Sequence, residues 1–165
     1  MLVTLREAEI LLPKWLENTG QWNSVYVDYH PPFVERLWRQ WGDYRVFLHR
    51  IHPCRLEEAL FHPHPWPSAM KILSGKYEMA VGFGGGEASP PVATTIILVE
   101  GTMYEMTHPD SWHYVRPLGE PAMSLMVAGK PWGRLFPGPE TKLQPLSEEQ
   151  QERIFSFFRQ IYKKQ

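Results

Sequence analysis

The sequence predicts a mainly β protein built as a small antiparallel barrel, with helices at both ends of the chain. Sixteen prolines and twelve glycines divide the 165 residues into short pieces. Aromatic residues make up 13% of the chain and supply bulky apolar side chains for these pieces to pack around. Between the breaks, short runs rich in β-branched and aromatic residues recur, as is typical of a sandwich or barrel.

The N-terminal segment carries the signals of a helix. Thr4 and Glu7 have the spacing of a capping box, and Asn18-Thr19-Gly20 is a typical helix end. We expect Pro13 to kink or split this helix. The apolar residues at helical spacing are Ala8, Leu11, Leu12, Trp15 and Leu16.

Residues 24–29 have the composition of a short strand, and Pro31-Pro32 can open a second helix. The apolar face of that helix would carry Val34, Leu37, Trp38 and Trp41. The sequence thus predicts a largely helical N-terminal extension over residues 4–42.

From residue 44 onward the pattern becomes one of strands, and we expect the barrel to occupy roughly residues 44–137. The β-prone runs are residues 44–51, 69–83, 92–99, 112–115 and 122–128. Glycine or proline separates each run from the next, as expected for antiparallel strands joined by turns.

A C-terminal helix is expected over residues 147–163. Ser147 and Gln150 have the spacing of a second capping box. Lys163 and Lys164 are cations at the C-terminal end, where the negative end of the helix dipole stabilises positive charge. The apolar stripe consists of Ile154, Phe157, Phe158 and Ile161. Because no repeat or long linker interrupts the chain, residues 1–165 are predicted to form a single domain.

Charge and cysteine content narrow the function classes. The net charge of -1 disfavours nucleic acid and anionic membranes as partners. Cys54 is the only cysteine, so an internal disulfide is excluded and a reducing compartment, the cytoplasm, is expected. The N-terminus meets charge too soon for a signal-peptide core, and no stretch approaches the ~20 apolar residues that span a bilayer.

The segment His62-Pro63-His64 predicts a metal site. In an extended chain residues i and i+2 point to the same side, so both imidazoles can reach one point in space. Neutral imidazole suits Fe, Zn, Cu and Ni. His113, on a distant predicted strand, is the natural third ligand, and His108 in the loop before it is the rival.

Two segments resemble the motifs of the cupin superfamily. His62, His64 and Gly75 match the spacing of the first motif, G-x5-H-x-H-x3-4-E-x6-G. Gly101 and His113 resemble the second motif, G-x5-P-x-G-x2-H-x3-N. The resemblance implies a double-stranded β-helix, or jelly roll, that holds one divalent transition-metal ion, and it makes a homodimer a reasonable expectation.

The chain departs from these motifs at four positions. Leu56 replaces the leading glycine, Ser68 replaces the glutamate, His113 lies one residue late, and Pro117 stands in place of the asparagine. Without the glutamate the ligands would be three neutral histidines, as in cupins that resemble the cysteine and diketone dioxygenases. Such a set leaves the ion its full charge, which helps it accept an anionic chelating substrate.

The resemblance therefore favours a mononuclear non-haem iron dioxygenase that acts on a small chelating substrate, with Fe(II) as the cofactor. Two alternatives stay open at this point. One is a redox-inert isomerase or lyase that uses Zn, Mn or Ni, and the other is a non-catalytic protein that binds a small molecule. A cupin without its metal fits the second alternative, since the glutamate is missing.

Several other residues are candidates for the pocket. Arg50 could anchor a substrate carboxylate, and the hydroxyls of Tyr77, Tyr104 and Tyr114 could donate to a bound ligand. Glu78 or Glu105 could replace the missing carboxylate if either faced inward. These three histidines are expected to be surface or structural residues: His30, His49 and His52.

Overall fold

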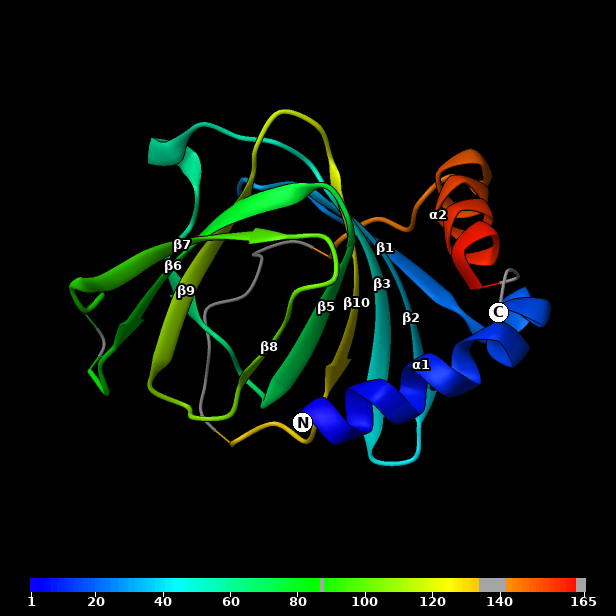
Figure 1. The fold of residues 1–165 in the computed structure, drawn as a ribbon, viewed down its shortest axis with the longest axis horizontal. Coiled ribbons are helices and arrows are strands. Elements are labelled where there is room, and N and C mark those ends of the chain that lie inside the picture. Colours follow the sequence, from blue (N-terminus) through cyan, green and yellow to red (C-terminus); the bar gives the residue numbers. More distant parts are fainter. Residues whose placement is uncertain (87, 134–141, 163–165) are drawn as a thin grey trace.

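In the computed structural model, two antiparallel sheets face each other, with two helices packed outside one of them (Figure 1). The structure describes residues 1–86, 88–133 and 142–162. The larger sheet has the strand order β1-β2-β3-β10-β5-β8 and the smaller one β4-β9-β6-β7. This arrangement confirms the mainly β fold with a helix near each end, although the strands form two sheets and not one closed barrel.

The described chain contains two α-helices and ten strands. The helices are α1 (Leu2–Glu17) and α2 (Glu148–Tyr162), with short 3-10 turns at Thr19–Gln21 and Leu56–Glu58. The larger sheet contains β1 (Asn23–Val27), β2 (Val34–Trp41), β3 (Tyr44–Ile51), β10 (Ala122–Ala128), β5 (Ser68–Ser74) and β8 (Met103–Met106). The smaller sheet contains β4 (His62–Pro63), β9 (Ser111–Pro117), β6 (Lys76–Phe83) and β7 (Val92–Val99).

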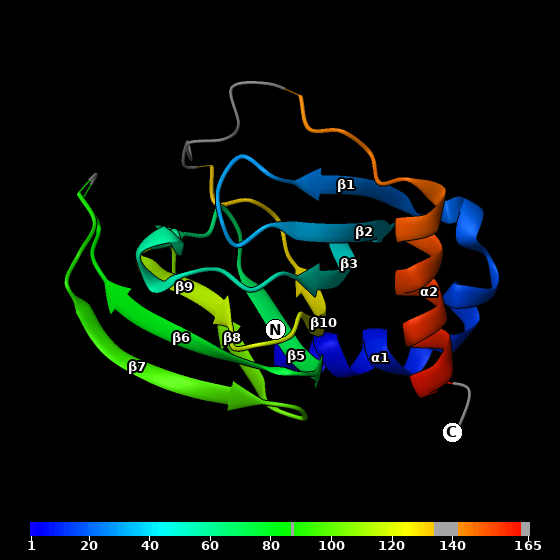
Figure 2. The same cartoon turned by 90° about the horizontal axis from the view of Figure 1, so that it is seen from above.

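The larger sheet separates the two largest hydrophobic cores of the described structure. Seen from above in Figure 2, α1 and α2 lie against its outer face, and β6 and β7 lie on the opposite side of the molecule. On β3, Val46 and Leu48 belong to the core beneath the helices, whereas Phe47 belongs to the core between the sheets. Strand alternation therefore sends neighbouring residues into different cores.

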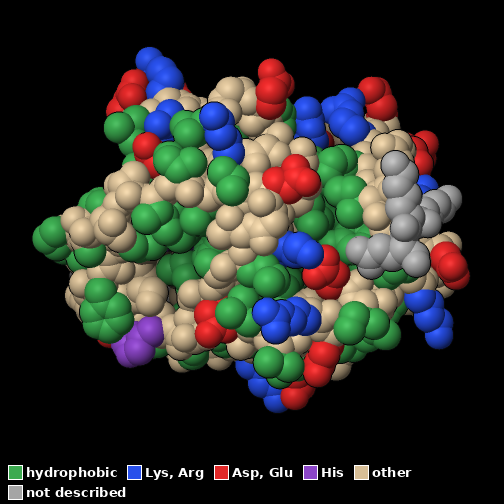
Figure 3. Space-filling view, viewed as in Figure 1, with side chains coloured by type: hydrophobic (Ala, Val, Ile, Leu, Met, Phe, Trp, Pro, Cys, Tyr) green, Lys and Arg blue, Asp and Glu red, His purple; other side chains and the backbone are tan. Residues whose placement is uncertain are grey.

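The end of the molecule formed by β6 and β7 carries few charged side chains in the view of Figure 3. Strand β7 is the edge of the smaller sheet, and its side chains are exposed apart from Leu98. The charged side chains lie mainly toward the helices and the rim of the molecule (Figure 3).

A glycine makes the tight turn from β5 to β6. Gly75 has φ of 81°, a conformation that other residues rarely adopt. A Cβ atom at this position would also lie 3.1 Å from Ala122 Cα. Both facts explain why residue 75 is a glycine where this hairpin turns beside β10.

The second predicted helix is wrong, because residues 34–41 form the strand β2. Its apolar pairs Val34/Trp38 and Leu37/Trp41 are four residues apart, a spacing that places two side chains on one face of a helix and also on one face of a strand. Pairing with β3 along the whole length of β2 decides the outcome. The N-terminal extension over residues 4–42 is therefore one helix followed by two strands of the larger sheet.

The first helix begins earlier than predicted. Met1 is the N-cap of α1 and makes no side-chain cap, so Thr4 lies inside the helix. The helix also continues through Pro13 without being split. Its buried residues Leu5, Ala8, Leu12 and Leu16 recur at helical spacing on both sides of the proline and anchor both halves to the sheet.

The C-terminal helix and its capping box are confirmed. The Ser147 amide donates to Gln150 Oε1 at 2.9 Å, and the Gln150 amide donates to Ser147 Oγ at 3.2 Å. Helix α2 then buries Ile154, Phe155 and Phe158. Residues 163 and 164, and the predicted barrel residues 134–137, lie outside the described residues.

In the described part of the chain, no helix is both long and apolar enough to cross a membrane. The single-domain organisation, the cytoplasmic location and the homodimer stay predictions.

Candidate metal centre

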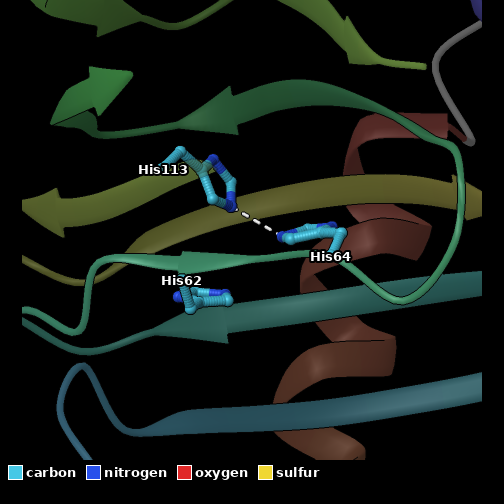
Figure 4. A group of neighbouring side chains, drawn as sticks. All are labelled: His62, His64 and His113. Carbon is cyan, nitrogen blue, oxygen red and sulfur yellow. Dashed lines mark hydrogen bonds between the residues drawn. The ribbon is translucent and has the colours of Figure 1, made fainter. Parts of the chain in front are cut away.

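The structure brings the three predicted histidine ligands together. His62 lies on β4 directly opposite His113 on β9, and His64 follows two residues after His62. One nitrogen from each ring lies within 4.8 Å of the other two. Figure 4 shows the His62 and His64 rings stacked, with the His113 ring approaching His64 from the neighbouring strand.

The closest pair is His64 and His113, whose Nε2 atoms lie 2.6 Å apart. A hydrogen bond between them needs one shared proton, and a divalent ion would take the place of that proton. Two nitrogens each about 2.1 Å from one ion lie about 3.0 Å apart in octahedral geometry and about 3.4 Å apart in tetrahedral geometry. The rings therefore need to separate by less than ~1 Å to hold an ion between them.

Hydrogen bonds at the other ring nitrogens orient two of the three histidines. His62 Nδ1 donates to the Leu60 carbonyl at 2.8 Å, which leaves its Nε2 free to accept a metal. His64 Nδ1 lies 3.4 Å from Ser68 Oγ. His113 Nδ1 is buried and has no hydrogen-bond partner among the described residues. The three Nε2 atoms are thus the donor set that fits a metal.

Burial keeps this cluster neutral. It lowers the pKa of His62, lowers that of His64 to about 3, and brings that of His113 well below its ordinary value. The neighbouring histidines of the cluster lower the pKa of His64 and of His113 further. Neutral imidazole is the form that binds metals, so protons do not compete for these nitrogens at neutral pH.

Ser68, which replaces the motif glutamate, lies beside His64 and is buried at the start of β5. Its hydroxyl faces His64 Nδ1, so it orients this ring. Neither Glu78 nor Glu105 fills the place of the glutamate. Glu78 Oε1 accepts from Tyr114 and Arg116, and Glu105 Oε2 accepts from the Leu2 amide and pairs with the N-terminal ammonium.

Two of the four pocket candidates face the space between the sheets. The Tyr77 and Tyr104 hydroxyls lie 3.2 Å apart and lie 3.1 and 3.2 Å from Met70 Sδ. The Tyr104 ring is 6.5 Å from that of His113. Burial raises the pKa of Tyr104 to about 12, so this phenol stays protonated.

The other candidates lie away from the cluster. Arg50 donates to Glu35 on the helix side of the larger sheet, and the Tyr114 hydroxyl donates to Glu78. The rival ligand His108 is 55% exposed and lies beside Asp110 and Phe83.

Sequence reasoning missed two residues near the cluster, Arg36 and His49. His49 was expected at the surface or in a structural role, yet it is only 2% exposed and accepts a hydrogen bond from Arg36 Nε at 3.0 Å. Its pKa is lowered well below the ordinary value by burial, by Arg36 and by His64. The alternation of Phe47, His49 and Ile51 along β3 is the signal that could have placed His49 between the sheets.

The two facing sheets and the three-histidine cluster define a protein of the cupin-type fold that could hold one metal ion. No family model matches the chain, and no curated protein matches it. The fold likeness comes from solved structures at low sequence identity.

The iron(II) form of HppE is 12% identical, with a TM-score of 0.50, 64% of this chain covered and 55% of that one. Hydroxypropylphosphonic acid epoxidase from S. wedmorenis is 15% identical, with a TM-score of 0.50, 67% of this chain covered and 56% of that one. KdgF from Halomonas sp. is 12% identical, with a TM-score of 0.47, 64% of this chain covered and 87% of that one. The chain spans little more than half the length of the first two structures, and these two show its fold.

Proposed function

We propose that the protein is a metal-dependent enzyme that binds one divalent transition-metal ion through His62, His64 and His113. Its activity would be that of a mononuclear non-haem iron dioxygenase on a small chelating organic substrate. The observation that carries this proposal is the convergence of three neutral imidazoles, one nitrogen of each within 4.8 Å of the others.

The chemistry of the ligand set supports iron and a chelating substrate. Three imidazoles add no negative charge, so an ion held by them keeps its full positive charge and leaves positions for a bidentate substrate. When bound, Fe(II) supplies the redox chemistry with O2. Both oxygen atoms enter the substrate in a dioxygenase, so no external reductant is required. HppE, which shares this fold, was solved with Fe(II), and this supports testing iron first.

The residues around the cluster have two roles in this proposal. Phe47, Met70 and Met79 belong to the apolar core between the sheets, which would exclude water from a substrate held by the histidines. The Tyr104 hydroxyl stays protonated and can donate a hydrogen bond to a substrate oxygen, since its pKa lies near 12.

Oxygen consumption tests the proposal. Protein purified without a metal-binding tag is loaded anaerobically with Fe(II), Zn(II), Mn(II) or Ni(II), each separately, and then mixed with O2 and a panel of 2-oxo acids, thiols and diketones. We expect substrate-dependent O2 uptake with Fe(II) alone. Uptake should be lost in His113→Ala and kept in the control His108→Ala, because His108 lies outside the cluster.

Two results would contradict the dioxygenase assignment. Turnover without O2 in the Zn(II), Mn(II) or Ni(II) form would indicate an isomerase or lyase. Tight retention of a panel compound with no turnover under any condition would indicate a non-catalytic binding protein.

A further inference from the structure

Arg36 is a half-buried cation on the inner side of the larger sheet. It lies on β2 opposite His49 on β3, and its guanidinium lies over the Phe47 ring at 5.3 Å. Phe47 belongs to the core between the sheets, so the Arg36 side chain is on the same side of the sheet as the metal centre.

Arg36 has no carboxylate partner in the described ranges of the chain. Its one hydrogen bond is from Nε to His49 Nε2, and its terminal amino groups make none to described residues. Arg50 and Arg116, in contrast, pair with Glu35 and Glu78 at 3.1 and 3.2 Å. Burial lowers the pKa of Arg36 to about 10, which still leaves it charged at neutral pH. A charge that is partly removed from water and has no carboxylate partner is costly, so it points to a ligand of opposite charge.

His49 adds a second donor to the same place. Arginine can only donate, so His49 Nε2 is the acceptor of the Arg36 bond and the proton of the neutral ring is on Nδ1. This Nδ1 is buried and has no acceptor within the described part of the chain. Since His49 itself is 2% exposed, its N–H is a preorganised donor that lacks a partner in the described part of the structure.

Trp66 supplies a third donor. Its ring stacks on Phe47, with centroids 6.4 Å apart and planes 14° apart. Its indole Nε1, which can only donate, is buried without an acceptor among residues 1–86, 88–133 and 142–162. The Arg36 terminal amino groups, His49 Nδ1–H and Trp66 Nε1–H thus lie around Phe47, and none of these donors has an acceptor among the described residues.

These donors lie close to the candidate metal centre. Trp66 follows the candidate ligand His64 by two residues, and the Trp66 and His49 rings both stack on Phe47, with centroids 6.4 and 5.7 Å from its centroid. A ligand held by the three histidines can therefore extend toward Arg36.

We propose that Arg36, together with His49 Nδ1–H and Trp66 Nε1–H, binds an oxyanion of the substrate that the metal centre takes, such as a carboxylate or phosphonate. This inference rests on the proposed function and specifies its substrate class: a small organic acid whose anionic group pairs with Arg36. A guanidinium binds such oxyanions through two parallel N–H donors, and a neutral substrate would leave the charge unpaired.

Calorimetric titration of the Zn(II)-loaded protein tests this assignment with three probes. Lactate is a chelating carboxylate, lactamide is its neutral counterpart, and hydroxymethylphosphonate carries a tetrahedral oxyanion in place of the planar one. The variants are Arg36→Met, Arg36→Lys and the control Arg45→Met. Arg45 is the matched control because it, like Arg36, lies over the Phe47 ring, but His49 accepts its hydrogen bond from Arg36 and not from Arg45.

We expect Arg36→Met to weaken lactate binding about 10- to 100-fold, the size of a lost hydrogen-bonded charge pair, and to leave lactamide binding unchanged. Arg36→Lys should restore part of the affinity because it restores the charge. Arg45→Met should bind lactate like the parent. If hydroxymethylphosphonate binds more tightly than lactate in the parent, the phosphonate is the preferred oxyanion.

Zinc content, measured on each variant by elemental mass spectrometry, separates this inference from the proposed function. Equal weakening of lactate and lactamide, an equal effect of Arg45→Met, or loss of zinc from Arg36→Met would overturn the role of Arg36 while the metal site stands. A parent protein that takes up no zinc would overturn the metal site and this inference together.

Discussion

The two faces of the larger sheet are built differently. Beneath the helices the core is formed by apolar side chains such as Leu12, Leu48 and Phe158, all fully buried. Between the sheets, the apolar core adjoins buried polar atoms that have no partner in the described structure. These atoms are His49 Nδ1, Trp66 Nε1, His113 Nδ1 and Ser124 Oγ. The helix-side face has three such atoms among the described residues, on Glu35 and Arg39, but both side chains hydrogen-bond through other atoms, to Arg50 and Gln21. The Trp66 and Ser124 side chains make no hydrogen bond to any described residue.

This difference indicates which face provides stability and which provides function. A strand sends alternate residues to opposite faces, so β3 gives Leu48 to the helix-side core and His49 to the space between the sheets. Buried polar groups without partners cost free energy, and proteins keep them mainly where a ligand satisfies them. Substitutions on the two faces should therefore affect different measurements.

The largest effect is expected from the helix-side core. Phe158→Ala removes a fully buried ring and should lower the free energy of unfolding by about 3–5 kcal/mol in urea titration. The Zn(II) affinity of the folded protein should not change. Phe83, 63% exposed, is the matched control, and Phe83→Ala should cost less than ~0.5 kcal/mol. A loss of zinc affinity in Phe158→Ala would contradict the separation of the two faces.

The metal should stabilise the parent protein but not a ligand variant. At free Zn(II) about 100 times the dissociation constant, the free energy of unfolding should rise by about 2.7 kcal/mol. His113→Ala should show almost none of this rise, because it removes one of the three ligands. Thermal unfolding with zinc and with a chelator measures the difference. An equal rise in both proteins would place the zinc site elsewhere.

Ser68→Ala should weaken zinc binding without removing it. The substitution deletes the hydroxyl that faces His64 Nδ1 and so loosens the orientation of this ring. Loss of such a supporting group typically lowers metal affinity about 10- to 100-fold, and the 3.4 Å contact favours the lower end. Competition with a chelating dye gives the affinity. Ser74→Ala, at the other end of β5, should bind zinc like the parent, and an equal loss there would exclude a specific role for Ser68.

The smallest effect is expected at the tyrosine pair. Tyr104→Phe removes the hydroxyl that lies 3.2 Å from that of Tyr77, and should lower the free energy of unfolding by about 1 kcal/mol. Zinc affinity should be unchanged because Tyr104 is not a ligand. The exposed Tyr29 provides the control, and Tyr29→Phe should leave the stability of the protein unchanged. A fall in zinc affinity in Tyr104→Phe would show that this hydroxyl supports the metal centre directly.

Much of the fold could be predicted because its signals are local. The strands at residues 44–51, 92–99 and 122–128 have the predicted bounds, since glycine or proline limits each run. The capping box of Ser147 likewise marks the start of α2. Residues 34–41 could not be assigned from the sequence because their apolar spacing fits both a helix and a strand, and only the pairing with β3 decides between them.

The site was predicted in part for the same reason. The i, i+2 spacing of His62 and His64 is a local signal, and the motif spacing led to His113. The proposed oxyanion donors could not be found this way, because Arg36 lies on the segment that was predicted to be a helix. Arg50 was chosen instead, and strand alternation places it on the opposite face from His49.

Metal content tests the central claim most directly. The parent and a His62→Ala/His64→Ala double variant are purified without a metal-binding tag, incubated with Fe(II) or Zn(II), desalted and analysed by elemental mass spectrometry. The three-histidine centre predicts one equivalent of metal in the parent and almost none in the folded double variant. A parent that takes up neither metal, or a variant that keeps its equivalent, would contradict the claim.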